Sequence, residues 1–289
     1  MTLTTMLAHD SSGPDTPRAT GQARAALGTM RETMRAEWTK LRTLPGMIWL
    51  LTATAVLTIA ASAAAAATTT CTAGSACQVD TAKLSLTGVQ FGQAAVAVLG
   101  VLAVGDEYST GMIRTTLAAI PHRTRMLAAK AAVLTAPVLA TASLAAGGSL
   151  LAGRIMLPGN GFTAARGFPT LSLEDGSVLR ATAGSALYLA LVALLALGVA
   201  VIVRDTATAT GIVLGLLYIF PIIGVVVSNN PALQRHLEQI GPMTAGLEIQ
   251  ATTGLRDLPL SPWEGLAVLA AWATAALLAG ALLLRFRDA

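Results

Sequence analysis

Six long intervals without a charged side chain dominate this sequence and limit what it can fold into. Trimmed to their apolar parts, they hold about 20–24 residues each and cover 44–67, 84–105, 131–153, 181–203, 207–227 and 265–284. A helix of about 20 residues spans about 30 Å, the thickness of a bilayer's hydrocarbon core. A charge at that depth costs about 2.5–3.5 kcal/mol on insertion scales. The pattern predicts an all-α membrane protein with six transmembrane helices.

The composition agrees with a membrane protein and argues against a soluble one. Only 12% of the 289 residues are charged and 54% are hydrophobic, with a mean hydropathy of +0.66, whereas soluble domains carry about 25% charged residues. The net charge of +4 is scattered between apolar runs rather than gathered in a patch, so we expect no nucleic-acid partner. Residues 1–24 lack the pattern of a signal peptide and are expected to form a disordered cytoplasmic tail. Residues 25–289 are expected to form a single transmembrane domain.

The basic residues predict the orientation. If both termini lie on one side of the membrane, that side carries 13 of the 19 Lys and Arg residues and the other side carries 6. Cytoplasmic loops are richer in Lys and Arg. Both termini and the polar loop at 106–130 are therefore expected to be cytoplasmic.

An amphipathic helix is predicted over residues 27–43, before the first span. One face carries apolar side chains, and these are Leu27, Met30, Met34, Trp38, Leu41 and Leu44. This pattern is typical of a helix in the membrane interface, with Trp38 at the level of the headgroups. The alternative is a solvated helix that merely precedes the span, and the continuous apolar face favours the interfacial one.

The six intervals contain no Asp, Glu, Lys, Arg or His. Ion-coupled transporters and proton pumps use such groups at membrane depth, so we do not expect ion coupling. No Lys is followed by Ser or Thr, so the chain has no phosphate-binding P-loop. Neither HExxH nor GxSxG occurs, and there are three histidines. These features favour a protein that is not an enzyme and holds no cofactor or metal of its own, and they leave open only a serine-based intramembrane site.

Three smaller features of the sequence permit two interpretations each. Gln90 and Gln93 are the most polar residues of the second interval and either line a path or form interhelical hydrogen bonds. Cys71 and Cys77 lie in an expected external loop and form either a disulfide, which that compartment favours, or two thiols. Two glycine pairs have the spacing of helix-packing motifs or match it by chance; they are Gly88 with Gly92 and Gly211 with Gly215.

The stretch "GDEYSTGMIRTTLAAIPHRTRMLAAK", Gly105 to Lys130, is a polar island between the second and third intervals. Asp106 and Glu107 are expected to end the second span. A short helix is predicted from Met112 to Pro121, because Thr110 can cap it and a proline disfavours helix at the residue before it. Its apolar stripe is predicted to be buried against another surface, since so short a helix is marginal in water. That stripe consists of Ile113, Leu117 and Ile120, and the basic residues expected at the anionic inner membrane surface are Arg123, Arg125 and Lys130.

The lead-in "RAEWTKLRT" (Arg35–Thr43) and this island resemble a known family. The chain is similar to the permease subunit of an ABC-2-type ABC transporter, a bacterial exporter of the cell membrane. In the family's signature loop, a Glu is followed by a Gly, a short helix, a Pro-basic turn and a Lys that opens the third span. The matching elements here are Glu107, Gly111, Met112–Ile120, Pro121–Arg123 and Lys130. Members often carry Thr after the glycine, where this chain has Met112.

The resemblance implies a transmembrane half that pairs with a second permease copy or a similar chain. Two separate ATP-binding cassette subunits would bind ATP and Mg²⁺, and membrane lipid would surround the chain. The loop after the second span would present a coupling helix to the ATPase, and Asn229–Gly254 would be the region that often forms short re-entrant helices outside. The implied contact residues are Glu107, Tyr108, Gly111, Met112, Ile113, Arg114, Leu117 and Ile120.

Two other classes of function remain to be separated from an exporter subunit. One is a non-transporting membrane anchor or signalling component that uses the island to dock a soluble partner. The other is a membrane-embedded enzyme. Copurification of an ATPase, docking of a kinase or regulator, and catalysis by the isolated chain would distinguish the three. Nothing in the spans identifies a transported substrate.

Overall fold

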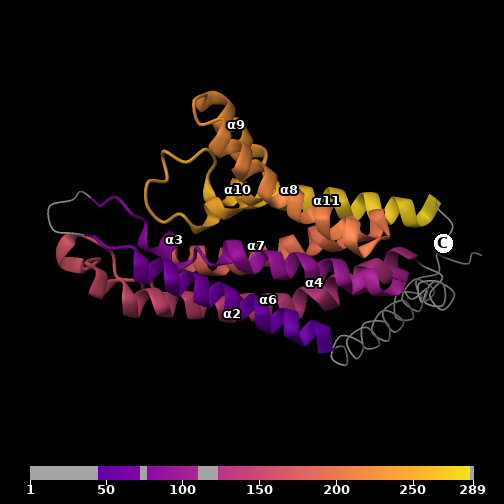
Figure 1. Ribbon diagram of the computed structural model, residues 1–289, viewed down its shortest axis with the longest axis horizontal. Helices are drawn as coiled ribbons and strands as arrows, with labels where there is room; N and C mark the ends of the chain where they lie inside the picture. The colour runs from indigo at the N-terminus through magenta and orange to yellow at the C-terminus, as the bar shows by residue number, and fades with distance from the viewer. Residues whose placement is uncertain (1–44, 72–76, 110–122, 287–289) are drawn as a thin grey trace, which may run out of the picture.

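In the computed structural model of the chain, the described residues are 45–71, 77–109 and 123–286 (Figure 1). They form helices and loops without a β-strand, as the all-α prediction requires. The interfacial helix predicted at 27–43 and the tail at 1–24 lie outside the described residues, so both stay predictions.

Among the residues that the structure describes, five helices are long and apolar enough to cross a membrane, which confirms the expectation of a multi-pass helical protein. They run along the long axis of the molecule in Figure 1. Their bounds are α2 (Pro45–Thr68), α6 (Arg123–Met156), α7 (Gly176–Val203), α8 (Thr206–Val226) and α11 (Pro262–Phe286). Pro137 and Pro221 lie inside α6 and α8, and neither ends its helix.

The second predicted span differs from a continuous helix over 84–105. The chain forms a short helix α3 (Thr81–Ser85), a turn at 86–88, and then α4 (Val89–Ser109), whose apolar part Val89–Gly105 is shorter than the five long helices. The turn lies against α2, where the Ser62 hydroxyl accepts a hydrogen bond of 2.9 Å from the Gly88 N–H. A methyl group at Gly88 would lie 1.9 Å from the Thr58 carbonyl oxygen. The helix is therefore interrupted where two backbones come into direct contact.

The helix that contains the third predicted span, 131–153, is longer than that interval. Helix α6 starts at Arg123 and has 34 residues, or about 51 Å at 1.5 Å per residue. It therefore extends beyond the thickness of a hydrocarbon core. Lys130, predicted to open this span at the headgroups, lies inside the helix and is 3% exposed. The charge-free interval marked the apolar part of the helix but not the turns before it.

Helix α7 is the centre of the molecule. It contacts α4, α6, α8 and α11, and 67% of its most apolar window is buried, against 22% for α2, α8 and α11. Small residues bring its neighbours close: a methyl group at Gly100 would lie 2.5 Å from the Ala193 carbonyl oxygen, and one at Gly198 would lie 2.7 Å from the backbone of α11. Close backbone approach at small residues is how membrane helices pack, because lipid supplies no hydrophobic drive between them.

The two glycine pairs noted in the sequence have different environments. Gly88 and Gly92 both face Thr58 of α2 so closely that no side chain fits, and this pair lies at a real helix crossing. Gly211 and Gly215 of α8 have no atom within 4 Å of an added methyl group. Within this chain the second pair is therefore on an open face.

The molecule has two distinct ends. The starts of α2 and α6 and the ends of α4 and α11 lie at one end of the molecule (Figure 1). We call it the island end, because the polar island follows α4 and precedes α6 in the sequence. The opposite end, called the loop end, carries the longer connections. These include η1 (Pro158–Asn160), η2 (Ala164–Arg166), α9 (Pro231–Ile240), α10 (Pro242–Leu247) and η3 (Glu248–Gln250).

The segment after α8, Asn229–Gly254, is folded rather than extended. Helix α9 projects from the body in Figure 1, and none of its residues is buried. In contrast, α10 and η3 are inserted against α7 and α11, with Leu247, Ile249 and Gln250 buried. Short helices therefore occur in the region where the family resemblance implies them.

Candidate functional site

The residues predicted to contact an ATPase are described only in part. Glu107 and Tyr108 lie in the last turns of α4, which continues past the expected end of the span to Ser109. Six further residues lie outside the described part of the chain, and they are Gly111, Met112, Ile113, Arg114, Leu117 and Ile120. The short coupling helix therefore stays a prediction.

The end of α4 is attached to the turn between α7 and α8. The guanidinium carbon of Arg204 lies 5.9 Å from the centre of the Tyr108 ring, at the range of a cation–π contact. Gly105 lies so close to Thr206 that a methyl group would be 2.5 Å from its hydroxyl oxygen. The helix that leads into the island is thus in contact with the central helix and its successor.

Arg204 ends α7 in a left-handed conformation, with φ of 62°. This conformation costs a residue other than glycine about 1–2 kcal/mol. Here it makes a sharp turn, after which the Asp205 carboxylate accepts a 2.8 Å hydrogen bond from the Thr208 N–H and caps α8. Hydrogen bonds from the Thr208 hydroxyl and N–H lower the pKa of Asp205, so the cap is ionised at neutral pH. The turn is a structured feature that holds Arg204 over the end of α4.

The start of α6 is also part of the protein core. Met126, Leu127 and Lys130 are buried, whereas Arg125 is exposed. Of the three basic residues predicted to lie at the anionic inner surface, Arg125 is exposed and Lys130 is buried, and the side chain of Arg123 lies outside the described part of the chain. Both helices that flank the island thus reach the interior, α4 through Tyr108 and α6 through its first turns.

A polar cluster lies inside the bundle, around Gln93. Its side chain is fully buried. The Tyr188 hydroxyl of α7 donates a hydrogen bond to its Oε1, and its Nε2 donates to the Met243 sulfur of α10 at 3.1 Å. The structure therefore has interhelical hydrogen bonds at Gln93, one of the two interpretations left open by the sequence. Gln90 is part-buried, and its carbonyl accepts a 2.7 Å hydrogen bond from the Tyr218 hydroxyl of α8.

A second buried amide, Gln250 of η3, extends these connections. Its Nε2 donates to the Ser185 hydroxyl at 3.0 Å and to the Leu86 carbonyl at 3.4 Å. It therefore joins the loop end to α7 and to the turn between α3 and α4. The sequence analysis missed Tyr188, Ser185 and Gln250. A usable signal was present for Tyr188, because it is one of three tyrosines in the chain and stands alone in a long apolar run.

Asp80 anchors the loop end. Its carboxylate caps α3 through the N–H groups of Ala82 and Lys83 and accepts hydrogen bonds from Thr252, through both N–H and hydroxyl, and from the Thr253 N–H at 2.9 Å. Burial raises the pKa of Asp80, but these hydrogen bonds outweigh it and hold the pKa below its ordinary value. One carboxylate thus holds together segments about 170 residues apart.

A nearby ion pair joins the same two regions. Lys83 Nζ lies 3.5 Å from Glu248 Oε2. Burial raises the pKa of Glu248, and the positive charge of Lys83 opposes that rise. This pair connects α3 to η3, and Asp80 connects α3 to the chain that follows η3.

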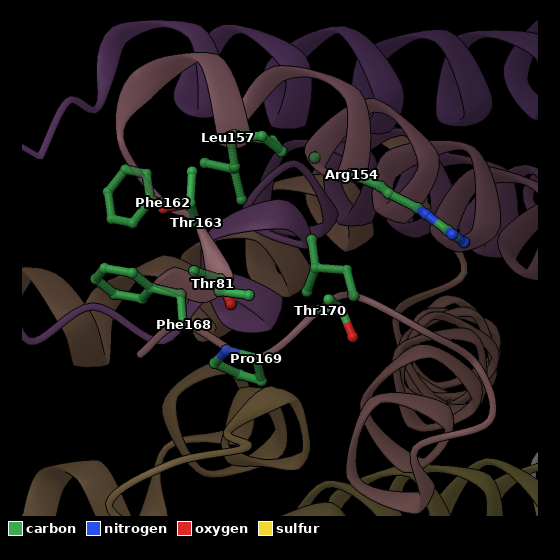
Figure 2. A pocket seen from close by; sticks show the side chains of 12 residues that line it. Thr81, Arg154, Leu157, Phe162, Thr163, Phe168, Pro169 and Thr170 are labelled. Atoms are coloured by element: carbon green, nitrogen blue, oxygen red, sulfur yellow. The ribbon is translucent and has the colours of Figure 1, made fainter. Parts of the chain in front are cut away.

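A pocket of about 270 Å³ opens at the loop end, beside the end of α6 (Figure 2). Its apolar wall includes Leu157, Leu171 and the Phe162 and Phe168 rings, whose centres are 5.0 Å apart. Arg154 lies at the other side of the pocket and extends away from the two rings (Figure 2).

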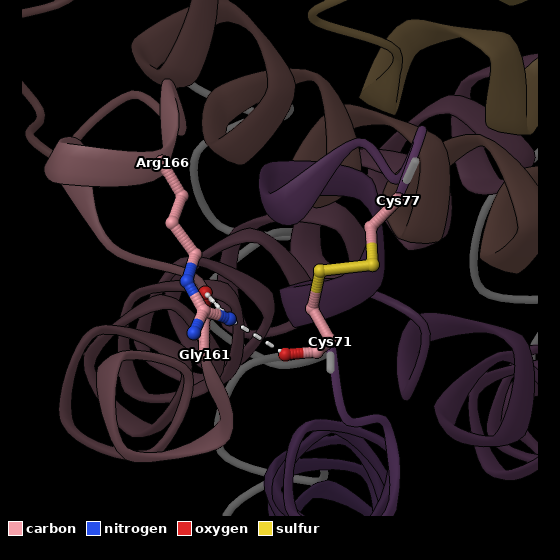
Figure 3. Close-up of a disulfide and its surroundings, with 4 residues drawn as sticks. All are labelled: Cys71, Cys77, Gly161 and Arg166. Carbon is pink, nitrogen blue, oxygen red and sulfur yellow. Dashed lines mark hydrogen bonds between the residues drawn. A yellow bond between two sulfur atoms is a disulfide. The ribbon is translucent and has the colours of Figure 1, made fainter. Parts of the chain in front are cut away.

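A disulfide between Cys71 and Cys77 lies next to this pocket (Figure 3). The Arg166 guanidinium donates to the Cys71 carbonyl at 2.8 Å, and the Cys71 N–H donates to the Asn160 carbonyl at 2.9 Å. Of the two possibilities open from the sequence, the structure has the bond rather than the thiols. The crosslink stabilises the loop that supports the pocket.

Among the described residues, no three His, Cys, Asp or Glu side chains gather into a group that could hold a metal ion. A scan of the chain against models of protein families finds no match. A search of curated proteins finds no significant relative either.

Proposed function

We propose that the chain is the permease subunit of an ATP-driven ABC exporter of the bacterial plasma membrane. It would form half of a translocation path together with a second copy or a similar chain. A separate ATP-binding cassette subunit would hydrolyse ATP. The proposal rests on the sequence of the polar island and on the contacts that attach the flanking helices, α4 and α6, to the rest of the protein.

The observation that carries the proposal is that α4 and α6, the helices before and after the polar island, are both attached to the protein core. Tyr108 and Gly105 of α4 contact the α7–α8 turn at Arg204 and Thr206. The first turns of α6 are buried, and α6 packs along α7 and α2. A soluble partner that moves the island would therefore move α4 and α6 against the central helix. A non-transporting membrane anchor that only docks a soluble partner does not need contacts between the helices flanking the island and the central helix.

The topology completes the proposal. We count α3, the turn at 86–88 and α4 together as the second of six crossings. The start of α2 and the end of α11 lie at the island end in Figure 1, and the excess of Lys and Arg on that side supports a cytoplasmic position for it. The open face of α8 at Gly211 and Gly215 is a surface against which a second permease could pack.

The test is copurification of the tagged chain from its native membranes, with an ATP-binding cassette protein as the expected partner. We expect the tagged chain to retain the ATPase and Leu117→Asp to lose it, because a charge would enter the predicted apolar stripe. The matched control is Thr115→Asp, which places the same charge off that stripe in a helix. Normal membrane insertion of each variant must be shown in parallel. Retention of the ATPase by Leu117→Asp, or capture of a kinase or regulator in its place, would contradict the proposal.

A further inference from the structure

The pocket at the loop end lies outside the hydrocarbon core. Arg154 is the first charge after the apolar interval of α6, so the residues that follow it lie beyond the end of the core. The other exposed residues that line the pocket all belong to the connection between α6 and α7, and they are Pro158, Ala164, Pro169 and Thr170. A ligand can therefore enter the pocket from the solution at the loop end.

The interior of the pocket favours an aromatic ligand. The rings of Phe162 and Phe168 are in edge-to-face contact, with their centres 5.0 Å apart, and Leu157 and Leu171 add to the apolar wall. An aromatic molecule beside such rings gains free energy beyond the burial of its surface. An apolar cavity of about 150 Å³ is enough to hold benzene. The pocket, at about 270 Å³, therefore has room for one substituted ring.

One buried hydroxyl group borders this apolar space. Thr81, the first residue of α3, is 4% exposed, and Figure 2 shows its side chain in the middle of the residues that line the pocket. Its carbonyl accepts a 2.7 Å hydrogen bond from the Ser85 hydroxyl, whereas its own hydroxyl has no protein partner in the described part of the chain. Buried polar groups are almost always hydrogen-bonded. Water or a ligand in the pocket therefore has to supply the partner.

The pocket favours a neutral ligand over a charged one. Arg154 is the one charged residue among those that line it, all of which belong to the described part of the chain. Its side chain extends away from the two phenylalanine rings (Figure 2). A charged group beside Phe162 and Phe168 would lose its hydration without gaining a partner of opposite charge, which is costly.

We propose that this pocket binds a neutral, single-ring aromatic molecule with one hydroxyl group. The ring packs against Phe162 and Phe168, and the hydroxyl forms a hydrogen bond with the Thr81 hydroxyl. The wall is held in place before the ligand binds, because the Arg166 guanidinium donates to the carbonyl of the disulfide-bonded Cys71 at 2.8 Å. Such preorganisation lowers the entropic cost of binding. The proposal does not depend on ATP-driven transport.

The experiment uses the purified full-length chain in detergent micelles and measures binding by fluorine NMR. The probe is para-(trifluoromethyl)phenol. It is compared with para-(trifluoromethyl)toluene, which has nearly the same shape without the hydroxyl, and with the negatively charged para-(trifluoromethyl)benzoate. Micelles without protein give the background of each probe. We expect the phenol to bind about fivefold more tightly than the toluene, the effect of about one hydrogen bond, and more tightly than the benzoate.

Two variants with matched controls test the named groups. Thr81→Val keeps the shape of the side chain and removes the hydroxyl, so the phenol should bind about fivefold more weakly and the toluene as before. Thr68→Val, at an exposed threonine of α2 outside the pocket, should change neither. Ala164→Trp places a large side chain in the pocket wall and should weaken binding of the phenol severalfold. Ala165→Trp, at the exposed neighbour that does not line the pocket, should not.

The unfolding midpoint of each variant shows whether it is folded, and either pair of variants decides the question if a member of the other fails to fold. Three results would overturn the proposal. The first is binding of the phenol that Thr81→Val leaves unchanged, and the second is binding that Ala164→Trp leaves unchanged. The third is tighter binding of the benzoate than of the phenol, which would assign the pocket to an anion held by Arg154. None of these results bears on whether an ATPase copurifies.

Discussion

At the scale of single residues, two polar side chains organise this apolar protein. Gln93 joins α4 to α7 and α10 inside the bundle, and Asp80 joins α3 to the chain after η3 at the loop end. A buried polar group costs about 1–3 kcal/mol when its partners are removed. Both residues therefore specify which segments contact each other. Apolar packing is less specific and does not determine such pairings well.

Asp80→Asn is expected to destabilise the protein by about 1–3 kcal/mol, because an amide cannot accept all of the hydrogen bonds that the carboxylate receives. The midpoint of thermal unfolding in detergent measures this loss. Asp257→Asn, at an exposed acid in the following loop, is the control and should leave the midpoint within the error. Equal midpoints for Asp80→Asn and the wild type would contradict the role of Asp80.

The same contact predicts a dependence on pH. The folded pKa of Asp80 lies below its ordinary value of 3.8. Its contribution to stability is thus present above pH 3.8 and is lost as the pH falls through the folded pKa. The stability difference between the wild type and Asp80→Asn should shrink over that acid range. A difference that stays constant down to the lowest pH tolerated would show that the charge of Asp80 is not involved.

At the scale of elements, the interruption of the second span is the main departure from the predicted helices. The turn at 86–88 exists because Gly88 and Gly92 let α2 approach the backbone of this segment. Short i to i+3 hydrogen bonds, such as Val89 N–H to the Leu86 carbonyl at 3.0 Å, carry the chain through it. The same Leu86 carbonyl also accepts a 3.4 Å hydrogen bond from Gln250 Nε2. The break and the loop end therefore form one connected structure.

Gly88→Ala is expected to lower the unfolding midpoint by several degrees, because the added methyl group would lie 1.9 Å from the Thr58 carbonyl and the two backbones must separate. Gly147→Ala in α6, which meets no atom within 4 Å, is the matched control and should be neutral or slightly stabilising. If the two variants behave alike, the crossing of α2 and this turn is not tightly packed.

The sequence predicted the apolar helices well where charges mark their ends. Arg180 lies near the start of α7 and Arg204 follows its last residue, and Glu264 and Arg285 lie within the first and last turns of α11. The prediction from sequence failed where the local structure depends on contact with a segment that is distant in the chain. The break at Gly88 requires the approach of Thr58, the burial of Lys130 requires knowledge of what packs on α6, and the partner of Gln93 lies 95 residues away in α7. No local pattern encodes these contacts.

At the scale of the whole molecule, the exposed surface is consistent with a bilayer. Large apolar side chains are exposed along the long helices, among them Val56, Leu144, Ile222 and Leu278. The most polar and most connected structures lie at the two ends. The loop end is closed by a disulfide, an ion pair and the Asp80 contacts. The island end is where α4 and α6 receive the polar island, and there the proposed ATPase would act.

The orientation is tested by cysteine labelling of intact cells with a membrane-impermeant reagent. Ala165→Cys and Ser172→Cys, both at the loop end, are expected to react, and Ser11→Cys is expected to react only after the cells are opened. Cys71 and Cys77 are joined to each other, so the background should be low. Reaction of Ser11→Cys in intact cells would contradict a cytoplasmic N-terminus.

The most direct test of the central claim is the rate of ATP hydrolysis in lipid nanodiscs. It should be measured for the chain alone and for its complex with the ATP-binding cassette protein expected to copurify with it. We predict no hydrolysis by the chain alone, because the sequence has no phosphate-binding loop. We predict hydrolysis by the complex that Leu117→Asp reduces or uncouples and Thr115→Asp preserves. Hydrolysis by the chain free of its partner, or a complex whose rate is the same for both variants and the wild type, would contradict an ATPase-driven permease coupled through the island.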